Sequence, residues 1–100
     1  MTIQEYQAFA TLGHKPGNGL IVHSLGIIGE VGEVIDCVKK GLRDGVPFDH
    51  EHVKEELGDV LWYVCNLATD LHIAMDDVID TNVEKLRRRY DLETQGNSDK

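Results

Sequence analysis

The sequence predicts an all-α protein in which one short and three longer helices pack as a four-helix bundle. Apolar residues recur at spacings of three, four and seven along four segments, and no stretch alternates apolar and polar residues as a half-buried strand does. The two prolines, Pro16 and Pro47, each lie in a cluster of helix-breaking residues. A chain of 100 residues favours a single domain. We place that domain at residues 1–90 and expect a polar tail at residues 91–100.

The first two predicted helices are separated by the loop Lys15–Gly19. The first spans Ile3–Leu12 and is weakly amphipathic. The second runs from about Leu20 to Leu42, with an apolar stripe at helical spacing. It contains glycine at positions 26, 29 and 32, although each glycine costs a helix about 1 kcal/mol relative to alanine. We therefore expect another helix or a ligand to approach this segment closely.

The last two predicted helices have recognisable start signals. The third follows Gly41–Phe48, a stretch rich in helix breakers, and opens at Asp49, which is a favourable N-cap residue. It continues to Leu71. The fourth opens near Asp76 or Asp77, and its last turn carries three consecutive arginines, so both of its ends suit the helix dipole. Its apolar stripe consists of Ile79, Val83, Leu86 and Tyr90.

The composition excludes several classes of partner. Ten basic and eighteen acidic residues give a formal net charge of −8, which argues against binding a nucleic-acid polymer or an anionic membrane through a basic surface. No apolar run approaches the roughly 20 residues that span a bilayer. The N-terminus lacks the basic and apolar regions of a signal peptide, and the two cysteines have neither metal-site nor disulfide-framework spacing. We therefore expect a cytoplasmic protein.

Two pairs of carboxylates have the same spacing on different predicted helices. Glu30 and Glu33 lie on the second helix, and Glu56 and Asp59 lie on the third. At about 100° per residue, both pairs border the apolar stripe on the same side, whereas Glu55 lies on the far side of its helix. Antiparallel packing would bring the four carboxylates together, where their charges would repel. A hard divalent cation such as Mg²⁺ would relieve that repulsion, because it prefers oxygen ligands and phosphates.

The fourth helix adds groups that suit a phosphate ligand. Asn82 lies in the apolar stripe, where its amide needs a partner. Lys85 and Arg89 follow three and seven positions later and share its face. The same pattern is also expected of an asparagine at the edge of a core with a basic last turn.

This combination of motifs resembles the MazG-like, all-α nucleoside triphosphate pyrophosphohydrolases. The resemblance rests on Glu30-x-x-Glu33, 22 intervening residues, then Glu56-x-x-Asp59, and it extends over roughly residues 4–90. It implies Mg²⁺-dependent hydrolysis of a nucleoside triphosphate, deoxy or noncanonical, to the monophosphate and pyrophosphate, a role in nucleotide-pool house-cleaning, and a homodimer or homotetramer. Mn²⁺ is expected to substitute for Mg²⁺.

Mapped residue by residue, the resemblance makes the four acids metal ligands. Our hypothesis for the mechanism is that one carboxylate of the first pair, Glu30 or Glu33, accepts the proton of the attacking water. Asn82 and Lys85 become substrate contacts. Additional substrate-binding candidates are Lys39, Lys54, Tyr63 and His23. The sequence departs from the family pattern after Tyr90, where relatives often continue with proline and a short tail containing glycine.

Two alternatives remain open at this stage. A non-catalytic helical module that dimerises and binds a nucleotide or a regulatory partner would share the helices but would not need four acids. A carboxylate-bridged redox metal protein would need a Glu-x-x-His pattern, which neither helix has.

Overall fold

A computed structural model describes residues 1–13 and 19–90 and confirms the all-α class. Four helices follow one another, α1 (Ile3–Thr11), α2 (Gly19–Asp44), α3 (His50–Asp70) and α4 (Met75–Arg89). Each end of these helices lies within two residues of the predicted end. Residues 15–18 of the predicted loop Lys15–Gly19 and the predicted tail at 91–100 lie outside the described part of the chain, whereas Gly19 is the first residue of α2. None of the described helices is long and apolar enough to cross a membrane.

The helix boundaries follow from local chemistry. Thr2 and Glu5 form a capping box at the start of α1, in which Thr2 Oγ1 accepts a hydrogen bond from Glu5 N at 3.0 Å and Thr2 N donates to Glu5 Oε1 at 2.6 Å. Asp49 caps α3, as predicted, by accepting a hydrogen bond from His52 N at 3.2 Å.

The second helix ends two residues later than predicted, at Asp44. Gly45 there adopts a left-handed conformation with φ of 67°, and Val46 N donates to Gly41 O at 3.1 Å. This is the Schellman arrangement that commonly ends helices. Gly41 is therefore a helical residue and not the start of the loop, and it has no side chain because the Phe48 ring packs directly against it.

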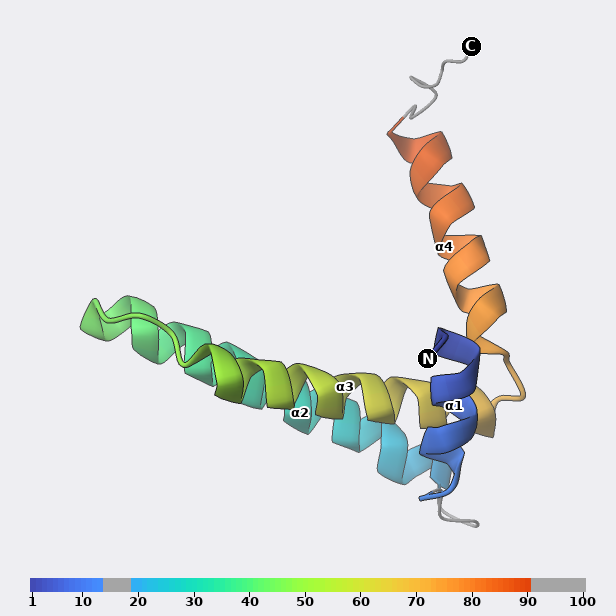
Figure 1. Ribbon diagram of the computed structural model, residues 1–100, viewed down its shortest axis with the longest axis horizontal. Helices are drawn as coiled ribbons and strands as arrows, with labels where there is room; N and C mark the ends of the chain where they lie inside the picture. Colours follow the sequence, from blue (N-terminus) through green and yellow to red (C-terminus); the bar gives the residue numbers. More distant parts are fainter. Residues whose placement is uncertain (14–18, 91–100) are drawn as a thin grey trace.

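The helices are arranged as a long hairpin with a separate arm. Helices α2 and α3 run antiparallel and pack along their lengths, while α1 covers the end of the hairpin where α3 finishes (Figure 1). Helix α4 packs mainly on α1 and leads away from the hairpin (Figure 1). Within one chain, α4 therefore does not close against the length of α2 and α3.

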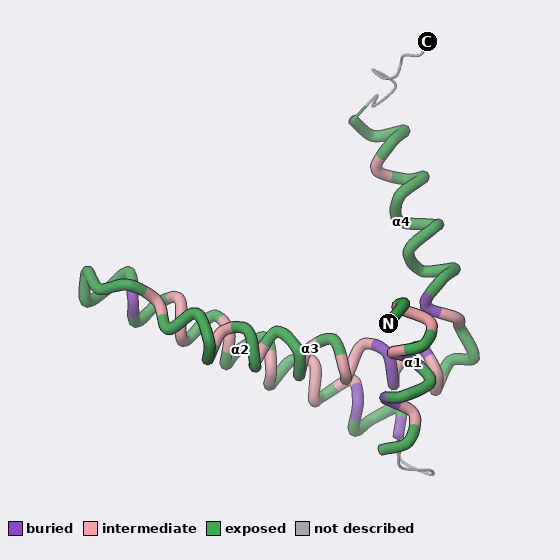
Figure 2. Tube along the Cα trace, in the orientation of Figure 1, coloured by how far each residue is buried: buried purple, intermediate pink, exposed green. Residues whose placement is uncertain are grey.

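The small core lies where α1, α3 and the start of α4 meet (Figure 2). Its buried apolar residues are Ala10, Cys65, Ala68 and Met75. The buried polar residues are Gln7, His23 and Asn66. Most of the hairpin's outer surface and most of α4 are exposed (Figure 2). Large apolar side chains on these surfaces therefore stay partly or mostly exposed within the described chain.

Gln7 fixes the start of α4 from a distance. Its Nε2 donates to Ile73 O at 2.9 Å, and its Oε1 accepts a hydrogen bond from Met75 N at 2.9 Å. Gln4 Oε1 accepts from Asp76 N at 3.0 Å. Because the N-cap residue Ala74 has no capping side chain, these two glutamines of α1 satisfy amide groups that a helix start leaves unpaired. The direction of α4 is thus set by α1.

Candidate metal centre

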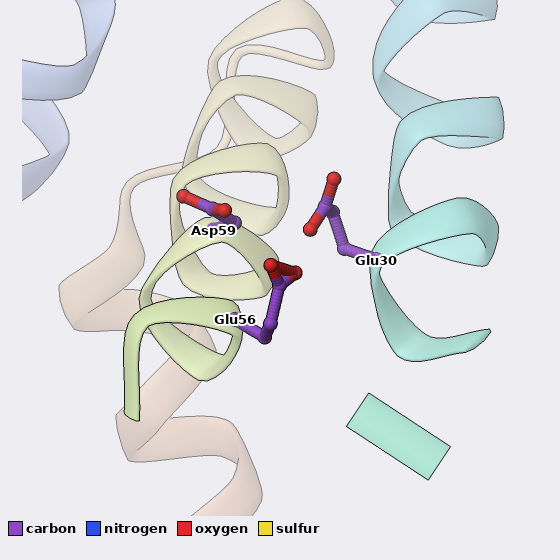
Figure 3. Close-up of side chains that lie close together, drawn as sticks. All are labelled: Glu30, Glu56 and Asp59. Carbon is purple, nitrogen blue, oxygen red and sulfur yellow. The ribbon is translucent and has the colours of Figure 1, made fainter. Parts of the chain in front are cut away.

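Three of the four predicted acids converge at the middle of the hairpin. Glu30 extends from α2 toward Glu56 and Asp59 on α3 (Figure 3). One carboxylate oxygen from each lies within 4.8 Å of the others. The convergence follows from the antiparallel packing of α2 and α3, because Glu30 on one helix and Glu56 and Asp59 on the other border the packed surface on the same side.

The three carboxylates of this cluster are not balanced by a cationic side chain of the described residues. Glu30 Oε1 and Glu56 Oε2 are inaccessible to solvent and have no hydrogen-bond partner among the described residues. The pKa of Glu30 is raised above its ordinary value, first by its side-chain interaction with Glu56, then by partial burial and by the charges of Glu56, Asp59 and Glu33. No lysine or arginine of residues 1–13 and 19–90 forms an ion pair with any of these acids.

These observations fit a hard divalent cation. Carboxylate oxygens are the ligands that Mg²⁺ and similar ions prefer, and a cation would satisfy the two buried oxygens and offset the mutual repulsion. Glu30, Glu56 and Asp59 are the residues that could hold it.

Glu33 lies outside this group of three. Its side chain is exposed, and it lines a neighbouring cavity of about 330 Å³ together with Cys37, Lys40, Phe48 and His52. Lys40 Nζ pairs with Asp36 Oδ2 at 3.0 Å in the same cavity. Sequence reasoning did not select Lys40, although its position seven residues after Glu33 places both side chains on one face of α2.

The two lysines that were selected lie elsewhere. Lys39 borders a surface groove with Ile35 and Leu42. Lys54 lines a different groove and pairs with Glu51 Oε2 at 2.9 Å. Neither lysine is brought to the acid cluster within the described chain.

Tyr63 and His23 belong to an aromatic group beside the cluster. His23 is buried, with its Nδ1 2.6 Å from Asp70 Oδ2, and its ring meets the Trp62 ring edge-on at a centroid distance of 5.8 Å. Tyr63 is half-buried and packs so closely on Gly26 that an added Cβ would lie 2.2 Å from its ring. Gly26 is thus explained by packing within the chain, and His23 is held mainly by its buried pair.

The two α4 candidates are far from the acids in sequence and in packing. Asn82 and Lys85 are exposed, and α4 makes its main contacts with α1. We expected the Asn82 amide, which lies in the apolar stripe, to need a partner; in the single chain its side chain is exposed, because α4 leads away from the hairpin (Figure 1). The structure therefore does not bring these two residues to the carboxylates of the same chain.

The chain is similar to a known protein family and to individual relatives. The family model described as the MazG nucleotide pyrophosphohydrolase domain matches residues 22–92. The chain is 42% identical over 77 residues to the Gene 37 protein of Mycobacterium phage L5, a match that covers 73% of this chain and 68% of the phage protein. It is 30% identical over 83 residues to dCTP pyrophosphatase 1 of Mus musculus, covering 77% of this chain and 46% of the mouse protein. No solved structure matches.

Proposed function

Because the chain belongs to the MazG nucleotide pyrophosphohydrolase family, we propose that it hydrolyses nucleoside triphosphates to nucleoside monophosphate and pyrophosphate in a Mg²⁺-dependent reaction. The observation that supports this most is the cluster of Glu30, Glu56 and Asp59, with its two unpartnered buried oxygens. Mn²⁺ is proposed to substitute for Mg²⁺, since both accept carboxylate oxygens.

In the proposed reaction, Glu30, Glu56 and Asp59 hold the cation. When bound, Mg²⁺ supplies positive charge that offsets the charge of the phosphate oxygens. Glu33, exposed beside the cluster, accepts a proton from the attacking water. The water oxygen forms a bond to a phosphorus atom next to the oxygen that bridges the α and β phosphates. The bond between that phosphorus and the bridging oxygen breaks, so that nucleoside monophosphate and pyrophosphate separate. Asn82 and Lys85 contact the triphosphate in this proposal.

The substrate is proposed to be a deoxynucleoside or noncanonical nucleoside triphosphate. The support is indirect, since one relative is named a dCTP pyrophosphatase. We further propose that the reaction takes place in the cytoplasm and removes unwanted nucleotides from the pool. A panel that contains dCTP, the other deoxynucleotides and the ribonucleotides would define the preference.

A matched pair of variants tests the proposed chemistry. Pyrophosphate release is measured for the wild type, Glu33→Gln and Glu55→Gln with Mg²⁺. Glu55 is the control because it is an exposed acid of α3 that lies outside the cluster. We expect the rate of pyrophosphate release by Glu33→Gln to fall at least about 100-fold, as is typical for loss of a general base. The rate of Glu55→Gln should stay near that of the wild type. Normal pyrophosphate release by Glu33→Gln would remove Glu33 from the reaction.

The chain is also proposed to form a homodimer, or a tetramer built of dimers. Large apolar side chains on α2 are exposed, among them Leu25 at 64%, Ile28 at 70% and Ile35 at 58%. A contiguous apolar surface of this kind marks an interaction site. Light scattering on the purified chain would measure the state, and a monomer at micromolar concentration would contradict the proposal.

A further inference from the structure

A buried pair of side chains joins α2 to α3 at the open end of the hairpin, opposite the connection at residues 45–49. His23 Nδ1, on α2, lies 2.6 Å from Asp70 Oδ2 at the last residue of α3, and the two side chains are 1% and 6% exposed. Burying a carboxylate costs free energy, and a partner regains only part of it, so such a pair adds little net stability compared with apolar residues of the same size. What the pair does fix is the separation of α2 and α3 at this end.

The imidazole ring of His23 extends this link toward the acid cluster. It packs against the Tyr63 ring at a centroid distance of 6.1 Å. Tyr63 in turn lies so close to Gly26 that an added Cβ there would be 2.2 Å from its ring. Tyr63 follows Asp59 by about one helical turn, and Gly26 precedes Glu30 by about one turn. The contacts that begin at His23 therefore bring α2 and α3 together one turn away from the acids.

The acids themselves push the two helices apart. Glu30 faces Glu56 and Asp59 across the hairpin (Figure 3), and one carboxylate oxygen of each lies within 4.8 Å of the others. Like charges at this separation repel. The chain connects α2 to α3 through residues 45–49, so the helices cannot separate at that end. At the open end, contacts between side chains have to oppose the repulsion.

Helix α1 covers the same end of the hairpin, but its bonds serve a different purpose. Asn66 Nδ2, on α3, donates to Ala10 O at 3.2 Å, and Gln7 Nε2 donates to Thr69 Oγ1 at 3.1 Å. Helix α1 packs chiefly on α3 and α4. These bonds hold α1 on α3, whereas the pair of His23 with an α3 carboxylate holds α2 on α3.

We propose that His23 and Asp70 are positioning residues for the cation site. Their buried pair holds α2 against α3 at the open end of the hairpin, so that Glu30 stays opposite Glu56 and Asp59 before the cation binds. His23 thus acts through the packing of the two helices and not by contact with the substrate. Residues that orient metal ligands without touching the metal commonly change metal affinity roughly 10–100-fold. This inference rests on the proposed function only in that the acids hold a divalent cation.

Calorimetric titration with Mg²⁺ alone tests the proposal without any activity. Asp70→Ala removes the link, and we expect it to weaken Mg²⁺ binding at least about tenfold. The control is Asp36→Ala, which removes the same charge and an exposed ion pair with Lys40, six positions after Glu30 on α2. Because that pair is exposed, the control should bind Mg²⁺ within about twofold of the wild type. A wild-type affinity in Asp70→Ala, or an equal loss in both variants, would overturn the proposal.

Hydrogen exchange separates positioning from a general loss of stability. In EDTA, Asp70→Ala should speed amide exchange at residues 19–30 of α2 at least about tenfold and leave exchange next to the connection at residues 45–49 within about twofold of the wild type. Saturating Mg²⁺ should reverse most of the increase, because a bound cation draws Glu30 back toward α3. Equal acceleration at both ends of the hairpin, with and without Mg²⁺, would show that the pair only stabilises the fold.

A conservative variant decides the question if Asp70→Ala does not fold. Asp70→Asn keeps the size of the side chain and an oxygen that can accept a hydrogen bond from His23 Nδ1, but a neutral hydrogen bond is about half as strong as a charge-assisted one. We expect Mg²⁺ binding to be roughly threefold weaker, which is half of the tenfold loss on a logarithmic scale. A folded Asp70→Asn with wild-type affinity would then overturn the proposal. A wild type that binds no Mg²⁺ would instead refute the cation site of the proposed function, and exchange in EDTA would still decide whether the pair holds α2 against α3.

Discussion

Removal of one charge from the acid cluster should stabilise the metal-free protein and abolish its response to metal. In Glu56→Gln, a carboxylate that lies within 4.8 Å of two others loses its charge. At that separation, two unit charges repel by about 1 kcal/mol in water and about 3.5 kcal/mol at an effective dielectric constant of 20. The cluster is partly exposed, so we expect a net gain of about 1–2 kcal/mol in the free energy of unfolding in EDTA, equivalent to a melting temperature roughly 4–16 °C higher for a chain of this size.

The effect should reverse when Mg²⁺ is present. At about 100 times its dissociation constant, a bound ion stabilises the wild type by about 2.7 kcal/mol. The variant should lose most of that gain. Thermal unfolding followed by circular dichroism at one protein concentration measures the stability difference between variant and wild type in EDTA and the gain of each in Mg²⁺. The control is Glu55→Gln, which should shift stability by less than about 0.5 kcal/mol in either condition.

The pH dependence of the metal-free wild type adds an independent check. Because the pKa of Glu30 is raised from its ordinary value of 4.5, the folded state binds more protons than the unfolded state between the ordinary and the raised value. This contribution to stability is therefore present at low pH and is lost as the pH rises through that window. Mg²⁺ should abolish the loss. A wild type that is more stable than Glu56→Gln in EDTA, or equal gains of both proteins in Mg²⁺, would refute the reasoning.

Three further predictions concern the scaffold and are read from thermal unfolding. Gly26→Ala should lower the free energy of unfolding by about 1–3 kcal/mol, because its Cβ would lie 2.2 Å from the Tyr63 ring. The control Gly58→Ala, whose Cβ meets open space, should raise the free energy of unfolding by up to about 1 kcal/mol. Similar values for the two variants would contradict this prediction. Gln7→Leu should cost about 2–3 kcal/mol and speed hydrogen exchange at the start of α4, since buried backbone groups lose their partner; unchanged exchange there would exclude the capping role. His72→Gly should gain about 0.5–1 kcal/mol, because His72 has a φ of 60°; a loss of stability would show that its side chain makes a needed contact.

The elements of the fold were predictable because their signals are local. The Asp49 cap and the three- and four-residue spacings located the helices to within about two residues. The convergence of Glu30 with Glu56 and Asp59 was also predictable, since it follows from two helix faces and antiparallel packing. Each of these inferences needs only the geometry of a helix and its neighbour.

The direction of α4 was not predictable in the same way. It depends on Gln7, which bonds to groups 66 and 68 positions away in the sequence, and on the left-handed backbone of His72. Periodicity places Asn82 in an apolar stripe but does not say what that stripe packs against. The exposure of Asn82 therefore came from the tertiary arrangement alone.

The most direct test of the proposed function is the identity of the products. The purified chain is incubated with dCTP and with other nucleoside triphosphates in Mg²⁺, and the products are followed by ³¹P nuclear magnetic resonance. Our account predicts resonances of the nucleoside monophosphate and pyrophosphate, which are absent in EDTA and strongly reduced in Glu56→Gln. Release of inorganic phosphate with the nucleoside diphosphate, or no product from any nucleotide, would contradict it.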